Sequence, residues 1–363
     1  MMKRPIAGLM ALSLFVAITG YMPKASAYQV LKCNGKTVKW QSSKIPVRMR
    51  SASVSFPSGA WRNALIEAVN SWNRNPSKFS FSLSHNDSSV RRQNGQNEIW
   101  FTSDDNLLNG APAWAYWWFN CPNITEVDIV FDNRVSYTTS TSKSVLWPYG
   151  GSSRPFQTTA MHELGHALIL LHENRYYNIM GQDWDHIHAN GSTARAYAGE
   201  DASHGAVFLY GVRSPQRQDV AVVHWKRSGS SGEYSTHRRT QMYNSSGSLL
   251  SSFTSSGEPV YRVNKGQRVQ VEFTYENNGA STQNPRVGFY ISTNNIISTL
   301  DTKIGDVPYT LGRNTPYTAR NSVTIPSNLT PGRYYIGAIV DNNNSIGEIN
   351  ETNNATYIAI QVN

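Results

Sequence analysis

The sequence has few charged residues, only two cysteines and one long apolar run. Charged residues make up 16% of the 363 residues and hydrophobic residues 39%. A composition this apolar excludes a wholly disordered chain. The run from Ile6 to Ile18 is shorter than the ~20 residues that span a bilayer, and no later stretch is long enough. We therefore expect no stable membrane span.

The first 27 residues are typical of a secretory signal peptide. Lys3 and Arg4 precede the apolar run, and small residues at 25–27 follow it as a cleavage pattern. We expect a secreted or periplasmic protein that begins at Tyr28. The alternative is a membrane anchor.

The positive charge is mild and spread thinly. The net charge of +9 falls to +6 when the three cations of the signal peptide are removed. The pairs Arg91–Arg92 and Arg238–Arg239 are isolated in polar segments, which is typical of solvated surface. We expect no nucleic-acid partner.

Export would place Cys33 and Cys121 in an oxidising compartment, where a disulfide between them is expected. A bridge that closes a loop of ~90 residues would stabilise the fold by about 4 kcal/mol. The alternative is that Cys33 binds a metal as a thiolate near the N-terminus, which would require Cys121 to be free.

The pattern of hydrophobic residues divides the chain into two domains. Residues 28–211 mix helix and strand patterns, whereas the rest shows only the alternation of strands. We therefore expect an α+β domain with a mixed, twisted sheet at 28–211, a linker at 212–218 and an all-β, antiparallel, immunoglobulin-like sandwich at 219–363.

Several elements follow from this pattern. Trp61, Leu65, Ala68 and Trp72 lie at helical spacing and predict a helix over 60–73 whose apolar face is core. Alternation predicts strands around 45–50, 79–83, 99–101, 114–119 and 127–131 in the first half, and around 269–275, 287–291, 334–340 and 358–362 in the second.

The chemistry of the chain is concentrated in the segment His162-Glu163-Leu164-Gly165-His166. Histidines four apart lie on one face of a helix, so both imidazoles can reach one Zn²⁺ at ~2.0–2.1 Å. Zinc lowers the pKa of a bound water towards ~7, and Glu163 would accept its proton as general base. The alternative is a pair of structural histidines that flank a helical glutamate.

A catalytic zinc site needs a third protein ligand, and His172 is the candidate. On an unbroken helix His172 would lie ~9 Å further along and rotated by roughly 240° from His166, facing away from the ion. The helix must therefore break between them. Other residues that could serve instead are Glu173, Asp185, His186 and His188, each of which is also an ordinary loop residue.

These histidines resemble the pattern HExxHxxGxxH of the metzincin clan of zinc peptidases. That resemblance implies that the helix ends at the glycine position, here Ile169, and that His162, His166 and His172 bind the metal. A β-branched residue is poorly suited to positive φ, so Ile169 is strained or the turn is built differently. Met180 in Tyr177-Asn178-Ile179-Met180-Gly181 resembles the Met-turn, whose methionine packs beneath the metal.

The order of elements from about 39 to 211 resembles the matrixin-like branch of that clan. The resemblance implies that residues 110–118 form an edge strand that pairs with an extended peptide. Residues 181–184, after the Met-turn, would line the pocket for the residue that follows the cleaved bond. The substrate-binding residues expected from the two segments are Ala113, Trp114, Ala115, Tyr116, Gln182 and Trp184.

The C-terminal half resembles the CARDB domain, a cell-adhesion-related module of bacteria, most clearly over residues 341–354. That family implies an immunoglobulin-like sandwich with a binding or positioning role. A Ca²⁺ ion at Asp341, Glu348 and Glu351 is conceivable, although acidic, Asn-rich turns are commonly solvated loops.

Three hypotheses follow. The first is a secreted zinc endopeptidase that cleaves proteins or peptides and carries a sandwich for extracellular matrix or a cell surface. The second is a catalytically inactive zinc-binding adhesin, which Ile169 favours. The third is a zinc hydrolase that acts on another kind of bond.

Overall fold

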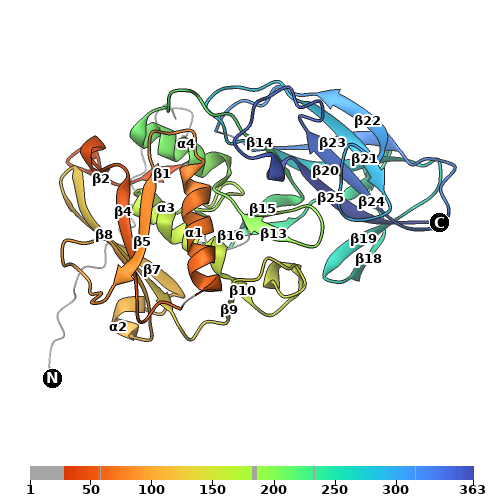
Figure 1. Cartoon of the computed structure of the whole chain (residues 1–363). Coiled ribbons are helices and arrows are strands. Elements are labelled where there is room, and N and C mark those ends of the chain that lie inside the picture. Colours follow the sequence, from red (N-terminus) through yellow and green to blue (C-terminus); the bar gives the residue numbers. More distant parts are fainter. Residues whose placement is uncertain (1–27, 58, 182–185, 232–233, 315) are drawn as a thin grey trace.

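The structure of the protein is a computed structural model, and it describes residues 28–57, 59–181, 186–231, 234–314 and 316–363. The predicted signal peptide lies outside these residues. Figure 1 shows an N-terminal half of helices and strands beside a C-terminal half of strands. Among the described residues, no helix is both long enough and apolar enough to cross a membrane.

A five-stranded mixed sheet forms the centre of the N-terminal half. Its order is β5 (Phe81–Asp87), β4 (Val47–Ala52), β6 (Glu98–Thr102), β8 (Asn123–Asp132) and β7 (Ala113–Asn120). The first four strands are parallel, and β7 runs antiparallel to β8 at the edge. The edge position expected for the aromatic strand is therefore present in the fold.

Two helices pack on each other in this half, α1 (Ala60–Asn73) and α3 (Phe156–Ala167). The predicted helix over 60–73 is confirmed, and Leu65, Ala68 and Trp72 are buried as expected from their spacing. α3 also packs on β7, so the helix that carries the histidine motif lies next to the edge strand.

Short elements complete the N-terminal half. They are β1 (Gln29–Val30), β2 (Lys32–Cys33), β3 (Lys36–Thr37), the 3₁₀ helix η1 (Ser42–Lys44), α2 (Asp105–Leu108), β9 (Tyr137–Thr138), η2 (Trp147–Tyr149), β10 (Arg154–Pro155), β11 (Leu170–Leu171), β12 (Ile187–Ala189), β13 (Ala194–Ala196) and α4 (Gly199–Tyr210).

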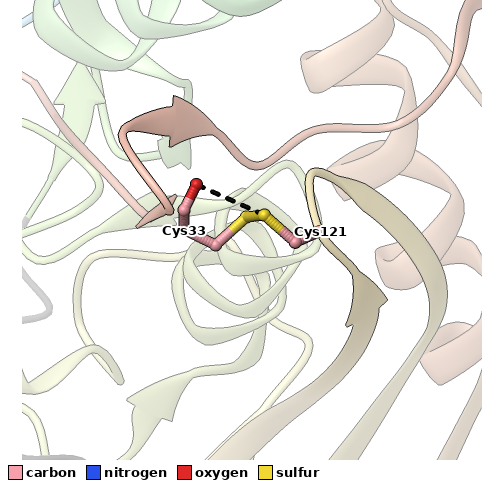
Figure 2. Close-up of a disulfide and its surroundings, with 2 residues drawn as sticks. All are labelled: Cys33 and Cys121. Carbon is pink, nitrogen blue, oxygen red and sulfur yellow. Dashed lines mark hydrogen bonds between the residues drawn. A yellow bond between two sulfur atoms is a disulfide. The ribbon is translucent and has the colours of Figure 1, made fainter.

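The disulfide between Cys33 and Cys121 is present, so the alternative of a Cys33 thiolate on a metal is wrong. Figure 2 shows the bridge, together with the contact from the Cys121 sulfur to the Cys33 carbonyl oxygen. The bridge joins the end of β2 to the turn between β7 and β8. It thereby ties the N-terminal segment to the edge of the sheet.

The C-terminal half is the expected sandwich of two sheets. One contains β14 (Val220–Val223), β17 (Met242–Asn244), β20 (Arg268–Asn277) and β23 (Tyr317–Thr324). The other has the order β18 (Ser252–Ser255), β19 (Glu258–Val263), β25 (Ala355–Val362), β24 (Gly332–Val340), β21 (Arg286–Ser292) and β22 (Thr302–Pro308), with the 3₁₀ helix η3 (Glu351–Asn353) before β25. Both sheets contribute buried residues to one hydrophobic core, which is what defines a sandwich.

The strands predicted in this half are confirmed, with one difference in their pairing. Alternation predicted an antiparallel sandwich, but β19 pairs with β25 in parallel. Strand direction depends on how the connections cross the sheet, which a pattern of alternating side chains does not encode.

The two halves are closely joined. Lys143 forms an ion pair with Glu258 at 3.2 Å, and the Arg217 guanidinium donates to the Asn73 carbonyl. A hairpin of β15 (Trp225–Ser231) and β16 (Tyr234–Arg239) leaves the sandwich, and its Trp225 joins the hydrophobic core of the N-terminal half. In Figure 1 this hairpin lies between the halves.

The variant Glu348→Gln is expected to flatten the pH dependence of stability. Burial raises the pKa of Glu348 to about 8, although hydrogen bonds from the Val220 N–H and the Asn354 amide lower it. A carboxyl group with a raised folded-state pKa stabilises the fold below its unfolded pKa of ~4.3, and this stability is lost as the pH rises through the folded pKa.

Thermal unfolding from about pH 5 to about pH 9 measures this effect. The Tm of the wild type should fall more over this range than that of Glu348→Gln. Glu351→Gln, at the neighbouring exposed carboxyl, is the control and should follow the wild type. Parallel profiles for wild type and Glu348→Gln would contradict the prediction.

Candidate metal centre

The helix that carries His162 and His166 is held in place by two buried tryptophans. The Trp72 indole N–H donates to the Met161 carbonyl and the Trp40 indole N–H to the Ala167 carbonyl, both at 2.8 Å. These bonds fix the middle and the C-terminal end of α3. The second one satisfies a carbonyl that has no partner within the helix.

The chain turns sharply after α3, as the spacing of the histidines predicted. The helix ends at Ala167, and Ile169 has φ of +74°, in the left-handed region that a β-branched residue rarely adopts. Ile169 is fully buried. The strand β11 that follows pairs antiparallel with β1, so the N-terminal segment of the described chain supports the turn.

The turn brings three imidazoles together. The Nε2 atoms of His162, His166 and His172 lie 3.1 Å from one another. Nitrogen ligands of a tetrahedral zinc with bonds of ~2.0–2.1 Å lie ~3.3 Å apart, so the donor set fits this ion closely. Among the described residues, these three form the one group of His, Cys, Asp or Glu side chains suited to a metal.

Hydrogen bonds orient two of the rings for metal binding. Nδ1 of His162 lies 2.8 Å from the Ile179 carbonyl oxygen, and Nδ1 of His166 lies 2.7 Å from that of Leu170. Because a carbonyl oxygen only accepts, Nδ1 carries the proton in each ring, and Nε2 is the atom that would bind a metal. Burial also lowers the pKa of His166 to about 4, which keeps the ring neutral at neutral pH.

Met180 packs against α3, the helix that carries His162 and His166, in a tightly bonded turn. A Cβ atom on Gly165, between His162 and His166, would overlap the Met180 sulfur, so the thioether is packed against α3. The turn is closed by the Asn178 side chain, which accepts from the Met180 N–H at 2.7 Å and donates to the Glu173 carbonyl at 2.9 Å. A side chain larger than hydrogen at 165 would displace the methionine.

Glu163 lies between the helix and the edge strand. Its side chain is almost fully buried, and the Ala115 N–H of β7 donates to its carboxylate. Burial raises the pKa of Glu163 to about 8 despite this bond. A divalent cation on the neighbouring histidines would favour the charged carboxylate and lower this pKa.

The edge strand contains four of the residues predicted to bind substrate. Ala113, Trp114, Ala115 and Tyr116 lie on β7, and Trp114 is exposed. One edge of β7 pairs with β8, and no further strand of the sheet covers its other edge among the described residues. Gln182 and Trp184, predicted for the adjacent pocket, lie outside the described residues.

The other candidate ligands do not join the histidine group. Glu173 is fully buried and pairs with Arg175, while His186 faces Glu276 of the sandwich. His188 is buried near Ala355 of the sandwich. Asp185 lies outside the described residues.

The residues considered for calcium have protein partners. The Asp341 carboxylate accepts from the backbone N–H groups of Ser345 and Ile346, which closes the turn after β24. Glu348 and Glu351 both accept from the Asn354 amide. These three carboxylates do not form a group suited to a metal among the described residues, and calcium there stays a prediction.

Several supporting groups escaped prediction from the sequence. They are the indoles of Trp40 and Trp72, the carbonyls of Leu170 and Ile179, the Ala115 N–H and the strand Gln29–Val30. Each acts through the backbone or across a large separation in the chain. Three of these residues carried a different signal in the sequence: Trp72 as a core position of the first helix, Ala115 as a substrate-binding residue and Ile179 as part of the Met-turn motif.

Comparison with known proteins identifies a CARDB domain at residues 252–357. The chain is similar to a crystal structure of a CARDB domain from Pyrococcus furiosus in complex with di-metal ions, with 18% identity, a TM-score of 0.25, and coverage of 40% of this chain and 94% of that one. The solution structure of that domain gives 19% identity and a TM-score of 0.25, with 40% and 96% covered.

An alkylpurine DNA glycosylase from Pseudomonas fluorescens, bound to DNA with an abasic site analogue, gives 18% identity and a TM-score of 0.19, with 27% of each chain covered. Such low TM-scores support no functional conclusion. No curated protein matches the chain. The CARDB domain lies within the C-terminal sandwich and does not include the three histidines.

The variant His172→Ala is expected to weaken zinc binding at least roughly 100-fold. The reason is that removing a metal ligand lowers the affinity more than removing the hydrogen-bond partner of a ligand does. Isothermal titration with zinc, after removal of bound metal, measures this. His85→Ala, on β5 at the opposite edge of the sheet from β7, is the control, and its zinc titration should match that of the wild type. Unchanged affinity in His172→Ala would place the third ligand elsewhere.

Proposed function

We propose that this chain is a secreted, zinc-dependent endopeptidase. The observation that carries the proposal is the convergence of His162, His166 and His172 beside the buried carboxylate of Glu163. The Met180 turn beneath α3 and the metzincin-like motif favour the same function. The predicted signal peptide and the disulfide are consistent with export.

In this proposal the three imidazoles would hold the ion and Glu163 would move the proton. Bound zinc would supply a Lewis acid that polarises the scissile carbonyl and acidifies a water molecule. Glu163 would accept the proton of the attacking water and pass it to the leaving amine. The Ala115 N–H fixes the carboxylate of Glu163 for this transfer.

The edge strand is the proposed binding site for the peptide. An extended peptide that pairs with β7 gains backbone hydrogen bonds, which are independent of its sequence. Ala115 links this strand directly to Glu163, so a peptide on β7 would lie beside the general base. The pairing therefore favours peptide substrates over the third hypothesis, a hydrolase of another bond.

The CARDB domain is the proposed binding module for extracellular matrix or a cell surface. It would bring the peptidase to its substrates. The alternative function for the whole chain is an inactive zinc-binding adhesin, which has the same metal site and lacks cleavage.

The variant Glu163→Gln is expected to keep one zinc and to lose cleavage of denatured casein by a factor of roughly 10²–10⁴, because the amide cannot accept the proton. Metal analysis and the casein digest are made on the same preparation. His166→Ala should lose both zinc and cleavage. A wild type that binds one zinc and cleaves no member of a peptide library would favour the adhesin instead.

A further inference from the structure

The hairpin of β15 and β16 reaches from the sandwich to the loop that carries Met180. We call residues 173–181 the methionine loop. Arg227 of the hairpin donates through Nε to the Asn174 carbonyl at 2.9 Å. The Tyr177 ring packs edge-on against His237, with centroids 4.9 Å apart, and lies parallel to Trp225 at 6.5 Å. The second half of the chain thus contacts the methionine loop directly.

A buried carboxylate on another strand of the sandwich reaches the same loop through intervening aromatic rings. Glu276 lies on β20 with 1% of its surface exposed. It accepts from the Tyr197 hydroxyl at 2.8 Å, and its other oxygen lies 3.5 Å from Nε2 of His186. Nδ1 of His186 donates to the Tyr197 carbonyl at 2.8 Å. Glu276 therefore holds the Tyr197 ring through a hydrogen bond and lies beside the His186 ring.

These rings form a series of tilted ring contacts that ends in the methionine loop. His186 lies between Tyr197 and Tyr177, with centroid separations of 4.4 Å on each side. The Tyr177 hydroxyl donates to the Ile187 carbonyl and accepts from the Ile187 N–H, both at 2.9 Å. Two residues beyond Tyr177, the Ile179 carbonyl accepts from Nδ1 of His162.

We propose that Glu276 is a positioning residue for the metal centre, so that the sandwich forms part of the catalytic unit. The inference rests on the proposed function above. Glu276 acts through His186, Tyr197 and Tyr177 on the loop that orients the His162 ring.

A buried carboxylate in a strand is unfavourable for the sandwich alone, because apolar packing would serve the sandwich as well or better. The partners of Glu276 described here lie in the other half of the chain: His186 just before β12, and Tyr197 between β13 and α4. The cost of burying the carboxylate is therefore offset by contacts that fix the position of these two residues.

The test uses the full chain and compares Glu276→Ala with Glu276→Gln. Glu276→Gln retains an oxygen that accepts from Tyr197. Tyr197→Phe removes the hydroxyl donor and keeps the ring contacts. Glu258→Ala is the matched control, because Glu258 is also a sandwich carboxylate bonded across the two halves, to Lys143. Its other described partners are Arg239 and Tyr357, and none of the three lies in residues 173–181.

Amide hydrogen exchange is the first readout. Exchange within residues 173–181 should be at least tenfold faster in Glu276→Ala and in Tyr197→Phe than in the wild type. The exchange rate should be close to the wild-type rate in Glu276→Gln and equal to it in Glu258→Ala. Tyr197→Phe keeps the test valid if Glu276→Ala does not fold. Equal exchange in all variants would overturn the proposal.

Cleavage kinetics are the second readout. Glu276→Ala should lower kcat about tenfold, with KM changed less than threefold, because the edge strand that would bind the peptide is not touched. Zinc content should stay at one per chain. A fall of the same size in Glu258→Ala would show a general loosening of the interface and overturn the positioning role. If the wild type cleaves nothing, the proposed function fails, and the exchange experiment still decides whether Glu276 holds the loop.

Discussion

The proposed metal centre depends on the tight reversal of the chain after α3. Ile169 adopts a positive φ, which costs about 1–3 kcal/mol for a residue of this type. Its side chain is fully buried, and burial of an isoleucine contributes about 1.5–3 kcal/mol. The pairing of β1 with β11 adds backbone hydrogen bonds at the same place. Packing therefore holds a turn that the residue by itself disfavours.

Buried polar groups hold the segments that carry the three histidines. The tryptophan indoles fix α3, backbone carbonyls orient His162 and His166, and the Asn178 side chain closes the turn that carries Met180. Each of these groups is matched with a partner, since an unmatched buried donor or acceptor is costly. The same requirement extends across the interface, where Glu276 meets Tyr197 and His186. Each half of the chain therefore has its own hydrophobic core, and buried hydrogen bonds connect the two halves.

Much of the local structure followed from periodicity. The helix at Ala60–Asn73 and strands β20, β21, β24 and β25 of the sandwich lie where their apolar residues recur at 3.6 or 2 positions. The break after His166 followed from geometry, because three ligands cannot share one side of a straight helix at that spacing. The parallel pairing of β19 with β25 and the reach of the β15–β16 hairpin followed from no local pattern.

The sequence by itself determined which residues could bind a metal, which helix carries two of them and where that helix has to stop. Only the tertiary structure decided how the turn is made, since Ile169 is stable at positive φ through contacts with residues distant in the chain. It also decided that the β15–β16 hairpin of the C-terminal half touches the methionine loop. The physical reason is that the sequence gives the spacing of neighbouring residues directly, whereas burial and hydrogen-bond partners arise only when distant segments pack together.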